Sequence, residues 1–204
     1  MKKLIIWFIA IIVLVAMGYG NAHSNENKGF QNSYFNITEN YALLMAESIA
    51  NGDYGQARYY ENLRNQKKAL LGIQDNITFD NLLLLAKIVH AEAGSSWLTE
   101  EHRQLVASVV MNRVDSPEFP NTIYNVTYQK GQYAPVGTKH FEKLIPSRRC
   151  VFSALEILAG GSIAPSDVVF QANFRQGSGV YKSIHDSKLG STYFCYSNNR
   201  KLYK

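Results

Sequence analysis

The sequence is short of cysteine and of charged residues, and no segment of it repeats. Its 204 residues include two cysteines, Cys150 and Cys195, so at most one intramolecular disulfide can form. Spacing cannot show whether the two meet, so a disulfide and two buried free thiols remain equal alternatives. Charged residues make up 18% of the chain and hydrophobic residues 46%. This composition excludes a disordered tail and fits one globular domain with a short accessory segment.

The sequence also lacks the features of a nucleic-acid-binding protein and of a metal site. Its formal net charge is +5, but the basic residues form no dense stripe and accompany no recognisable reading element. We therefore expect no nucleic-acid partner. His90-x-Glu92 matches the start of a zinc-deaminase signature, yet the Pro-Cys-x-x-Cys run that completes such a site is missing. We therefore expect no metal and no cofactor.

The N-terminus has the composition of a secretory signal. An apolar run from Leu4 to Met17 follows Lys2 and Lys3. Small residues at Gly20 and Ala22 predict a signal peptide over 1–22 with cleavage after Ala22. The run is shorter than the roughly 20 apolar residues that span a membrane, which favours cleavage over an uncleaved anchor. The protein is therefore predicted to be exported, and to contact the membrane only through this segment.

Two accessory segments are predicted between the signal and the main domain. Residues 23–35 are rich in Asn, Gly and Ser, which indicates a linker. Residues 36–77 read as a helical hairpin, whose first helix ends at Asn51-Gly52 and whose second runs from Asp53 towards Leu71 and Gly72. One hairpin cannot bury a core alone. We therefore expect it to pack on the main domain, residues 78–204.

The main domain is predicted to begin with two helices. Thr78 is a suitable N-cap for a helix over Phe79–Ala93, because its hydroxyl can accept a hydrogen bond from a free backbone N–H, and Gly94 ends that helix. Its many apolar side chains indicate that it is largely buried. Thr99 caps the second helix, which Pro117 prevents from continuing.

The rest of the chain is predicted to be a loop, a third helix and a small sheet. The loop covers 119–146, and a loop of this length in a compact domain is usually functional. Ser147 caps a helix that ends at Gly160-Gly161. Three short strands are indicated by an apolar period of two, over Val168–Ala172, around Val180-Tyr181 and over Ser191–Tyr196. The predicted fold class is α+β, mainly helical, with a small C-terminal antiparallel sheet.

Glu92 is an unexpected residue on the apolar face of the first main-domain helix. At 100° per residue it lies about 20° around the helix from Leu85 and about 60° from Val89. Apolar neighbours and the helix C-terminus both disfavour its charged form, so we predict a raised pKa. A carboxyl group that stays protonated near neutrality suits general-acid cleavage of a glycosidic bond. The alternative is a frayed helix end where Glu92 pairs with Lys87 or Arg103.

Six segments of the main domain occur in the order found in one family of enzymes. They are Leu85–Gly94, Val106–Val114, Phe119–Ile123, Tyr128–Tyr133, Val169–Asn173 and Gly190–Cys195. Together they resemble the catalytic domain of the cell-wall hydrolases related to the spore-cortex-lytic enzymes, the SleB-like family. The resemblance covers about Thr78 to Tyr196, which is more specific than any one motif.

The resemblance implies a lysozyme-like, lytic-transglycosylase-like domain that acts on peptidoglycan glycan strands in the cell wall. It implies cleavage between N-acetylmuramic acid and N-acetylglucosamine, with a single catalytic glutamate that matches Glu92. Two departures stand out. The family often has a second glutamate within an Ala-Arg-Gly-Glu run, where this chain has Gly94-Ser95-Ser96-Trp97. The repeats that often precede the family's domain are absent, so a germination role does not carry over.

Several other residues are candidates for substrate binding, because amides and flat rings hold saccharides. Gln129, Gln132 and Tyr133 are predicted to line the groove, with Phe170 and Gln171 on the opposite wall. The alternative is that the aromatic residues are core residues and the glutamines are solvated. Asn112 could support Glu92 from the neighbouring helix, or bond to backbone instead.

Four other acidic residues could supply a second carboxylate, and two rival functions are possible. A second catalytic carboxylate could come from Asp115, Glu118, Asp167 or Asp186, but each fits a cap or turn better, so we predict a single-carboxylate route. One rival is a cysteine amidase or endopeptidase that uses Cys150 and His185. Another is a binding module without catalysis. We expect a monomer in each case.

Overall fold

The computed structural model describes residues 26–203. The chain divides into two compact units, residues 1–35 and 36–204. The predicted signal peptide, residues 1–22, lies outside the described residues. So do residues 23–25, the beginning of the predicted linker.

The linker prediction is wrong for residues 26–35, because helix α2 runs over Glu26–Ala50. The segment has no proline, and its one glycine, Gly29, costs a helix only about 1 kcal/mol. Its polar composition is therefore compatible with a continuous helix. Composition alone could not distinguish a polar helix from a linker.

The second unit begins with the predicted hairpin, formed by residues 36–50 of α2 and by α3, Tyr54–Leu71. Asp53 caps α3 by accepting a hydrogen bond from the Gln56 N–H at 3.0 Å. Gly52 has a left-handed φ of 72°, as the predicted turn requires. Met45 and Ile49 are fully buried in the same core as the main-domain helices, so the hairpin packs on that domain as predicted.

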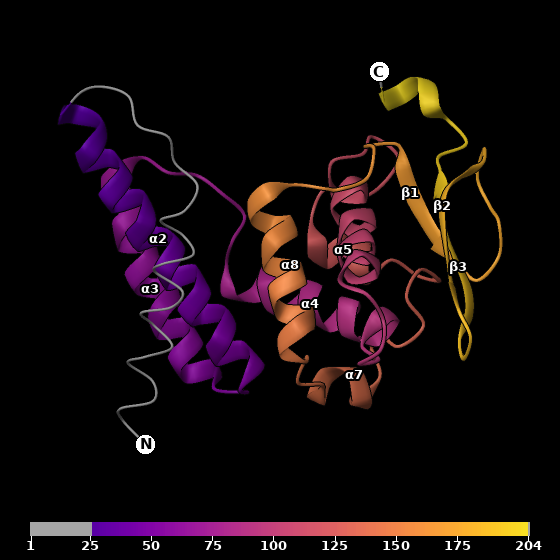
Figure 1. Ribbon diagram of the computed structural model, residues 1–204, viewed down its shortest axis with the longest axis horizontal. Coiled ribbons are helices and arrows are strands. Elements are labelled where there is room, and N and C mark those ends of the chain that lie inside the picture. The colour runs from indigo at the N-terminus through magenta and orange to yellow at the C-terminus, as the bar shows by residue number, and fades with distance from the viewer. Residues whose placement is uncertain (1–25, 204) are drawn as a thin grey trace. The chain divides into compact units, whose positions relative to one another are not determined.

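Three helices form the body of the main domain. They are α4 (Phe79–Ala93), α5 (Glu100–Val114) and α8 (Arg148–Gly160), and they pack against one another (Figure 1). The Thr78 and Thr99 hydroxyls each accept a backbone N–H at 3.2 Å, which confirms both predicted caps. Ser147 occupies the N-cap position of α8 but makes no capping bond through its side chain.

The predicted loop over 119–146 contains two short helices that the sequence analysis missed. They are α6 (Ile123–Thr127) and α7 (Lys139–Lys143), capped by Thr122 and Thr138. A five-residue helix completes little more than one turn, so it leaves no apolar period to detect. A 3-10 helix, η1, over Arg200–Tyr203 was also not predicted.

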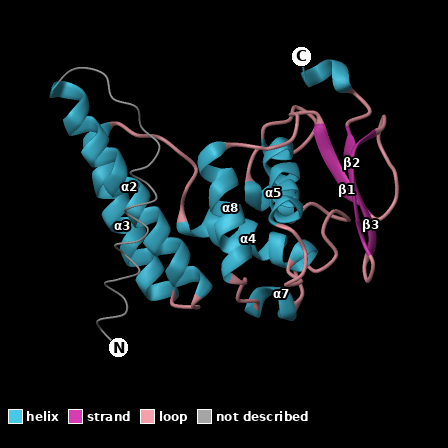
Figure 2. Ribbon diagram, in the orientation of Figure 1, coloured by secondary structure: helices cyan, strands magenta, loops and turns pink. Residues whose placement is uncertain are grey.

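The three predicted strands form one antiparallel sheet. They are β1 (Val168–Ala172), β2 (Val180–Asp186) and β3 (Gly190–Tyr196), and β3 lies in the centre of the order β1-β3-β2. Figure 2 shows the strands together on one side of the main-domain helices, where β1 packs on α5. The predicted fold class, α+β and mainly helical with a small antiparallel sheet, is confirmed.

The two cysteines do not form a disulfide. Cys150 in α8 and Cys195 in β3 are both buried free thiols, so the disulfide alternative is wrong. The Cys150 sulfur contacts the Ser147 hydroxyl at 3.1 Å, while Cys195 is paired with Phe170 and Val180 in the sheet. Over residues 26–203, no helix is both long and apolar enough to cross a membrane.

Candidate active site

Glu92 lies in the last turn of α4, where the helix leaves the core. Leu85 and Val89, on the same face, are fully buried and hold this end of the helix in place. The chain then turns tightly at Gly94. A Cβ atom there would lie 2.2 Å from the His90 carbonyl oxygen, so a side chain would force the backbone apart. The local sequence thus fixes where the Glu92 side chain begins.

The Glu92 carboxylate faces the sheet and contacts Gln171 of β1. The Gln171 Nε2 donates a hydrogen bond to Glu92 Oε2 at 3.1 Å. Burial raises the pKa of Glu92 above its ordinary value of 4.5, against smaller lowering effects from the Gln171 bond and the Arg113 charge. The residue as a whole is exposed, but the pKa depends on the surroundings of the carboxylate itself. The predicted direction is therefore confirmed, with burial as its main cause.

The alternative in which Glu92 pairs with Lys87 or Arg103 finds no support. Lys87 Nζ donates to the Glu142 carbonyl at 2.7 Å, and an Arg103 Nη donates to the Ser95 carbonyl at 2.9 Å. Neither cation therefore serves as the partner of Glu92.

Tyr133 and Arg113 complete the surroundings of Glu92. Tyr133 is buried, and burial raises its pKa, as does the nearby Glu92 charge; Arg113 lowers it. The Arg113 guanidinium lies 5.6 Å from the Tyr133 ring centroid and donates from Nε to the Val169 carbonyl at 2.6 Å. The Glu92 carboxyl group, the Arg113 guanidinium and the Tyr133 phenol are therefore close enough to affect one another's electrostatics.

Arg113 is the residue that the sequence analysis missed, although a signal for it was present. It follows Val106 and Val110 at helical spacing, so a charged side chain continues an apolar stripe, as Glu92 does on α4. The same reasoning applied to α5 would have identified it. Its guanidinium also lies 5.0 Å from the Phe119 ring centroid.

Three polar atoms of the predicted groove residues are buried without a hydrogen-bond partner among the described residues. They are the Tyr133 hydroxyl and the Oε1 atoms of Gln129 and Gln171. Buried polar groups are normally paired, and an unpaired one costs about 1–3 kcal/mol. Gln171 and Tyr133 lie near the Glu92 carboxyl group, and unpaired polar groups in such a place are suited to a polar ligand.

The other predicted groove residues differ in where they lie. Phe170 is half-buried and packs edge-on against Phe119, with ring centroids 6.3 Å apart. Gln132 is exposed, and no hydrogen bond within the described part of the chain joins it to Glu92.

Asn112 does not support Glu92, so the prediction of a supporting role is wrong. Its Nδ2 donates to the carbonyls of Pro165 at 2.7 Å and Val168 at 2.9 Å. The Asn112 side chain therefore holds the start of β1 by binding backbone carbonyl groups, which is the alternative given for it. It acts on the site only by anchoring the strand that carries Gln171.

No second carboxylate accompanies Glu92 within residues 26–203, where its electrostatic neighbours are Gln171, Arg113 and Tyr133. The other four acidic candidates hold structural positions, as predicted. Glu118 accepts hydrogen bonds from Ser197, Asn199 and Tyr203; Asp167 pairs with Arg200 at 2.6 Å; Asp186 accepts two turn N–H groups; and Asp115 is the exposed C-cap of α5.

The rival cysteine mechanism finds no support in the geometry. Cys150 is fully buried, and burial raises its pKa, which disfavours the reactive thiolate. His185 is exposed on β2, and its Nδ1 contacts the Ser191 hydroxyl at 3.1 Å. A catalytic cysteine needs the opposite conditions, an accessible sulfur beside a base.

The loop that departs from the family pattern is held in a defined conformation. Arg103 binds the Ser95 carbonyl, and Arg149 donates to the Ser96 carbonyl at 2.7 Å. Lys188, in the β2–β3 turn, lies 4.3 Å from the Trp97 ring centroid. The loop joins α4 to α5 and contacts the β2–β3 turn, and it supplies no acidic side chain.

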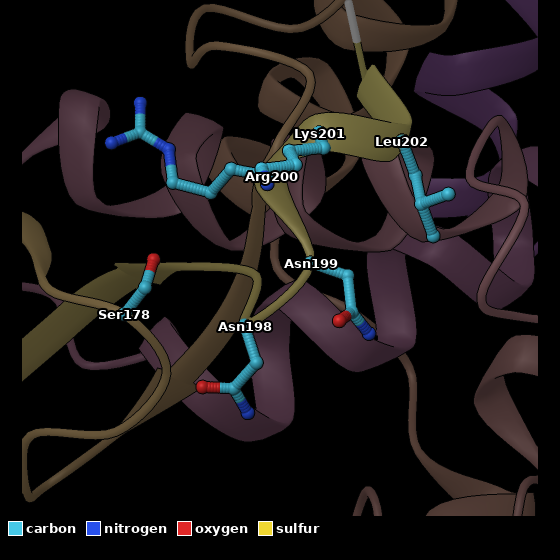
Figure 3. Close-up of a pocket in the computed structure, with 6 residues that line it drawn as sticks. All are labelled: Ser178, Asn198, Asn199, Arg200, Lys201 and Leu202. Atoms are coloured by element: carbon cyan, nitrogen blue, oxygen red, sulfur yellow. The ribbon is translucent and has the colours of Figure 1, made fainter.

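A separate pocket of ≈ 670 Å³ lies near the C-terminus (Figure 3). Figure 3 shows Arg200 and Leu202 pointing away from each other, so its side chains do not converge on one point. Arg200 is also occupied by Asp167. The pocket is lined by Ser178, Asn198, Asn199, Arg200, Lys201 and Leu202, and does not include Glu92.

Part of the chain is similar to known proteins. No curated protein matches the chain. A solved structure of the catalytic domain of the SleB protein from Bacillus cereus is similar at 20% sequence identity, with a TM-score of 0.47, covering 60% of this chain and 94% of that one. Residues 99–197 match the family described as Cell Wall Hydrolase. That match begins after Glu92, so the assignment of Glu92 rests on its geometry. Over residues 99–197, the predicted resemblance to the cell-wall hydrolases is confirmed.

Proposed function

We propose that the protein is an exported peptidoglycan hydrolase that cleaves between N-acetylmuramic acid and N-acetylglucosamine as a lytic transglycosylase. Glu92 acts as both acid and base. The observation that carries this proposal is the arrangement at the end of α4: a carboxyl group whose pKa is raised by burial, bonded to Gln171, beside the unpaired Tyr133 hydroxyl. Export is proposed from the signal-like residues 1–22 and fits a substrate outside the membrane.

Protonated Glu92 begins the reaction by donating its proton to the oxygen that bridges the two sugars. The C–O bond breaks, and positive charge develops at the anomeric carbon of the muramoyl residue. The Gln171 Nε2 donor, at 3.1 Å, stabilises the carboxylate that Glu92 becomes. Arg113 favours the same anion through its charge.

The same carboxylate then acts as a base. It accepts the proton of the muramoyl C6 hydroxyl as that oxygen bonds to C1, which closes a 1,6-anhydro ring and restores protonated Glu92. No water is consumed. A hydrolytic route commonly uses a second carboxylate, either to activate water or to form a covalent intermediate. The structural positions of Asp115, Glu118, Asp167 and Asp186 favour the route that needs only Glu92.

Purified sacculi provide the test. The mature protein and its Glu92→Gln variant are incubated with sacculi, and the soluble products are analysed by mass spectrometry. We expect anhydromuramoyl ends from the parent and almost no product from the variant. Products with only reducing muramic ends would replace the transglycosylase with a hydrolytic muramidase. Peptide cleavage without glycan cleavage would overturn the glycosidase assignment.

A further inference from the structure

Two tyrosines on α6 form an exposed aromatic pair. Tyr124 and Tyr128 expose 60% and 42% of their surfaces, and their ring centroids lie 4.5 Å apart with planes at 26°. Each ring therefore covers one face of the other, while much of the surface of both side chains stays exposed. Large aromatic side chains are normally buried or placed at binding surfaces, so an exposed stacked pair requires an explanation.

The pair is mounted on a well-anchored element. Ile123 and Val126, on the inner face of α6, are buried in the core, and the helix packs on α4 and α5. The Tyr128 N–H donates to the Tyr124 carbonyl at 2.9 Å, which closes the turn between the two rings. Binding a ligand would therefore require little ordering of the backbone, which favours affinity.

The chain continues directly from this pair into the candidate active site. Tyr128 is followed by Gln129, whose Oε1 is buried and unpaired among the described residues. A turn closed by the Gln132 N–H and the Gln129 carbonyl, at 3.2 Å, then leads to Tyr133 beside Glu92. The exposed rings and Tyr133, which interacts electrostatically with Glu92, thus lie on one short segment of the chain.

We propose that Tyr124 and Tyr128 form a saccharide subsite, at which a glycan strand cleaved at Glu92 is held by sugar rings further along the strand. The subsite rests on the proposed function, because it takes the same polymer. A pyranose ring offers a flat C–H face to an aromatic ring, and the exposed surface of the pair can accept one. A second copy of the chain is a poorer occupant, since stable protein interfaces bury about 1,200–2,000 Å², far more than two tyrosines supply.

The test compares long and short substrates. The Tyr124→Ala/Tyr128→Ala double variant is assayed on isolated glycan strands and on a tetrasaccharide fragment. We expect kcat/KM to fall about threefold to tenfold on long strands, mainly through KM, and to stay unchanged on the fragment. The Tyr124→Phe/Tyr128→Phe variant should retain the parent's rate, because the ring faces bind.

Tyr59→Ala is the matched control, because Tyr59 is also an exposed tyrosine in an aromatic pair, with Tyr60 on α3. Thermal unfolding followed by circular dichroism checks that each variant folds. Equal losses on both substrates, no loss on long strands, or a change of oligomeric state in the double variant would overturn the subsite. If the parent cleaves no glycan, the proposed function fails. Co-sedimentation with intact sacculi then tests the subsite independently of cleavage. Weaker binding by the double variant supports the subsite, and equal binding by the two proteins overturns it.

Discussion

Replacing Glu92 with Gln should have opposite effects on activity and on stability. Glutamine has nearly the shape of glutamate, and its side-chain oxygen can still accept the Gln171 hydrogen bond made at 3.1 Å. The substitution therefore removes the ionisable proton and leaves the local geometry in place. General acid–base catalysis typically contributes 10²–10⁴-fold. Because the described residues bring no second carboxylate to Glu92, we expect kcat to fall by about that factor.

The pH dependence of the parent follows from the raised pKa of Glu92. A general acid works while it is protonated, so activity should persist above pH 4.5, the ordinary pKa of glutamate, and fall as the pH rises through the higher folded value. Removing the charge of Arg113, which lowers this pKa, should move the fall to higher pH. Initial rates on sacculi measured across the pH range test both expectations.

The effect on stability has the opposite sign. A carboxyl group whose pKa is raised on folding stabilises the native state fully only below its unfolded pKa, and this contribution is lost as the pH rises through the folded pKa. Near neutrality the raised pKa therefore costs the parent native-state stability, and Glu92→Gln, which has no ionisable proton, avoids that cost. We expect the variant to unfold at a higher temperature than the parent at neutral pH, with the difference vanishing below about pH 4.

A matched control separates this effect from the general loss of a surface charge. Glu156 on α8 is also an exposed carboxylate bound by a glutamine, since Gln104 Nε2 donates to Glu156 Oε2 at 2.7 Å. Glu156→Gln should leave the rate and its pH profile unchanged. The reasoning is refuted if Glu92→Gln retains activity within about threefold of the parent, or if it is less stable than the parent at neutral pH while remaining folded.

Three further substitutions test other parts of the structure. Tyr133→Phe removes a buried hydroxyl that lacks a partner among the described residues, so the melting temperature should be unchanged or higher while kcat/KM falls; a clear loss of stability would reveal a partner. Cys150→Ala should retain glycan cleavage, whereas an inactive folded variant would restore the cysteine mechanism. Gly177→Ala should lower the free energy of unfolding by more than about 1 kcal/mol in urea titration, because φ is +66° and the new Cβ would lie 1.9 Å from the Tyr196 carbonyl oxygen; unchanged stability would contradict this.

The parts of the fold that the sequence predicts well are those with local causes. Thr78 and Gly94 bound α4 because a hydroxyl cap and a residue without a side chain act within one helical turn. The strands followed from their period of two. The short helices α6 and α7 escaped because their positions depend on packing against α4 and the rest of the core rather than on a repeating pattern of their own.

The candidate site divides in the same way. Glu92 could be found because its own helix surrounds it with apolar residues, which is a property of nearby sequence. The contact with Gln171 spans 79 residues, so it depends on how β1 docks against the helices. Asn112 shows what local sequence cannot predict. It lies on the helix next to α4, but its side chain binds the backbone at the start of β1 instead of Glu92. Local pattern identifies which residues are unusual, and docking decides what they contact.

The opposing influences on Glu92 suit a group that must act twice. Burial alone would hold the proton and leave a poorly stabilised anion after transfer, whereas the Gln171 bond and the Arg113 charge alone would remove the proton before the substrate arrives. Together they raise the pKa and still provide a donor and a cation for the anion. Because the carboxylate that donates the proton must then take one from the C6 hydroxyl, neither state can be strongly favoured over the other. The end of α4 therefore needs both its apolar stripe and its polar neighbours for one glutamate to serve both steps.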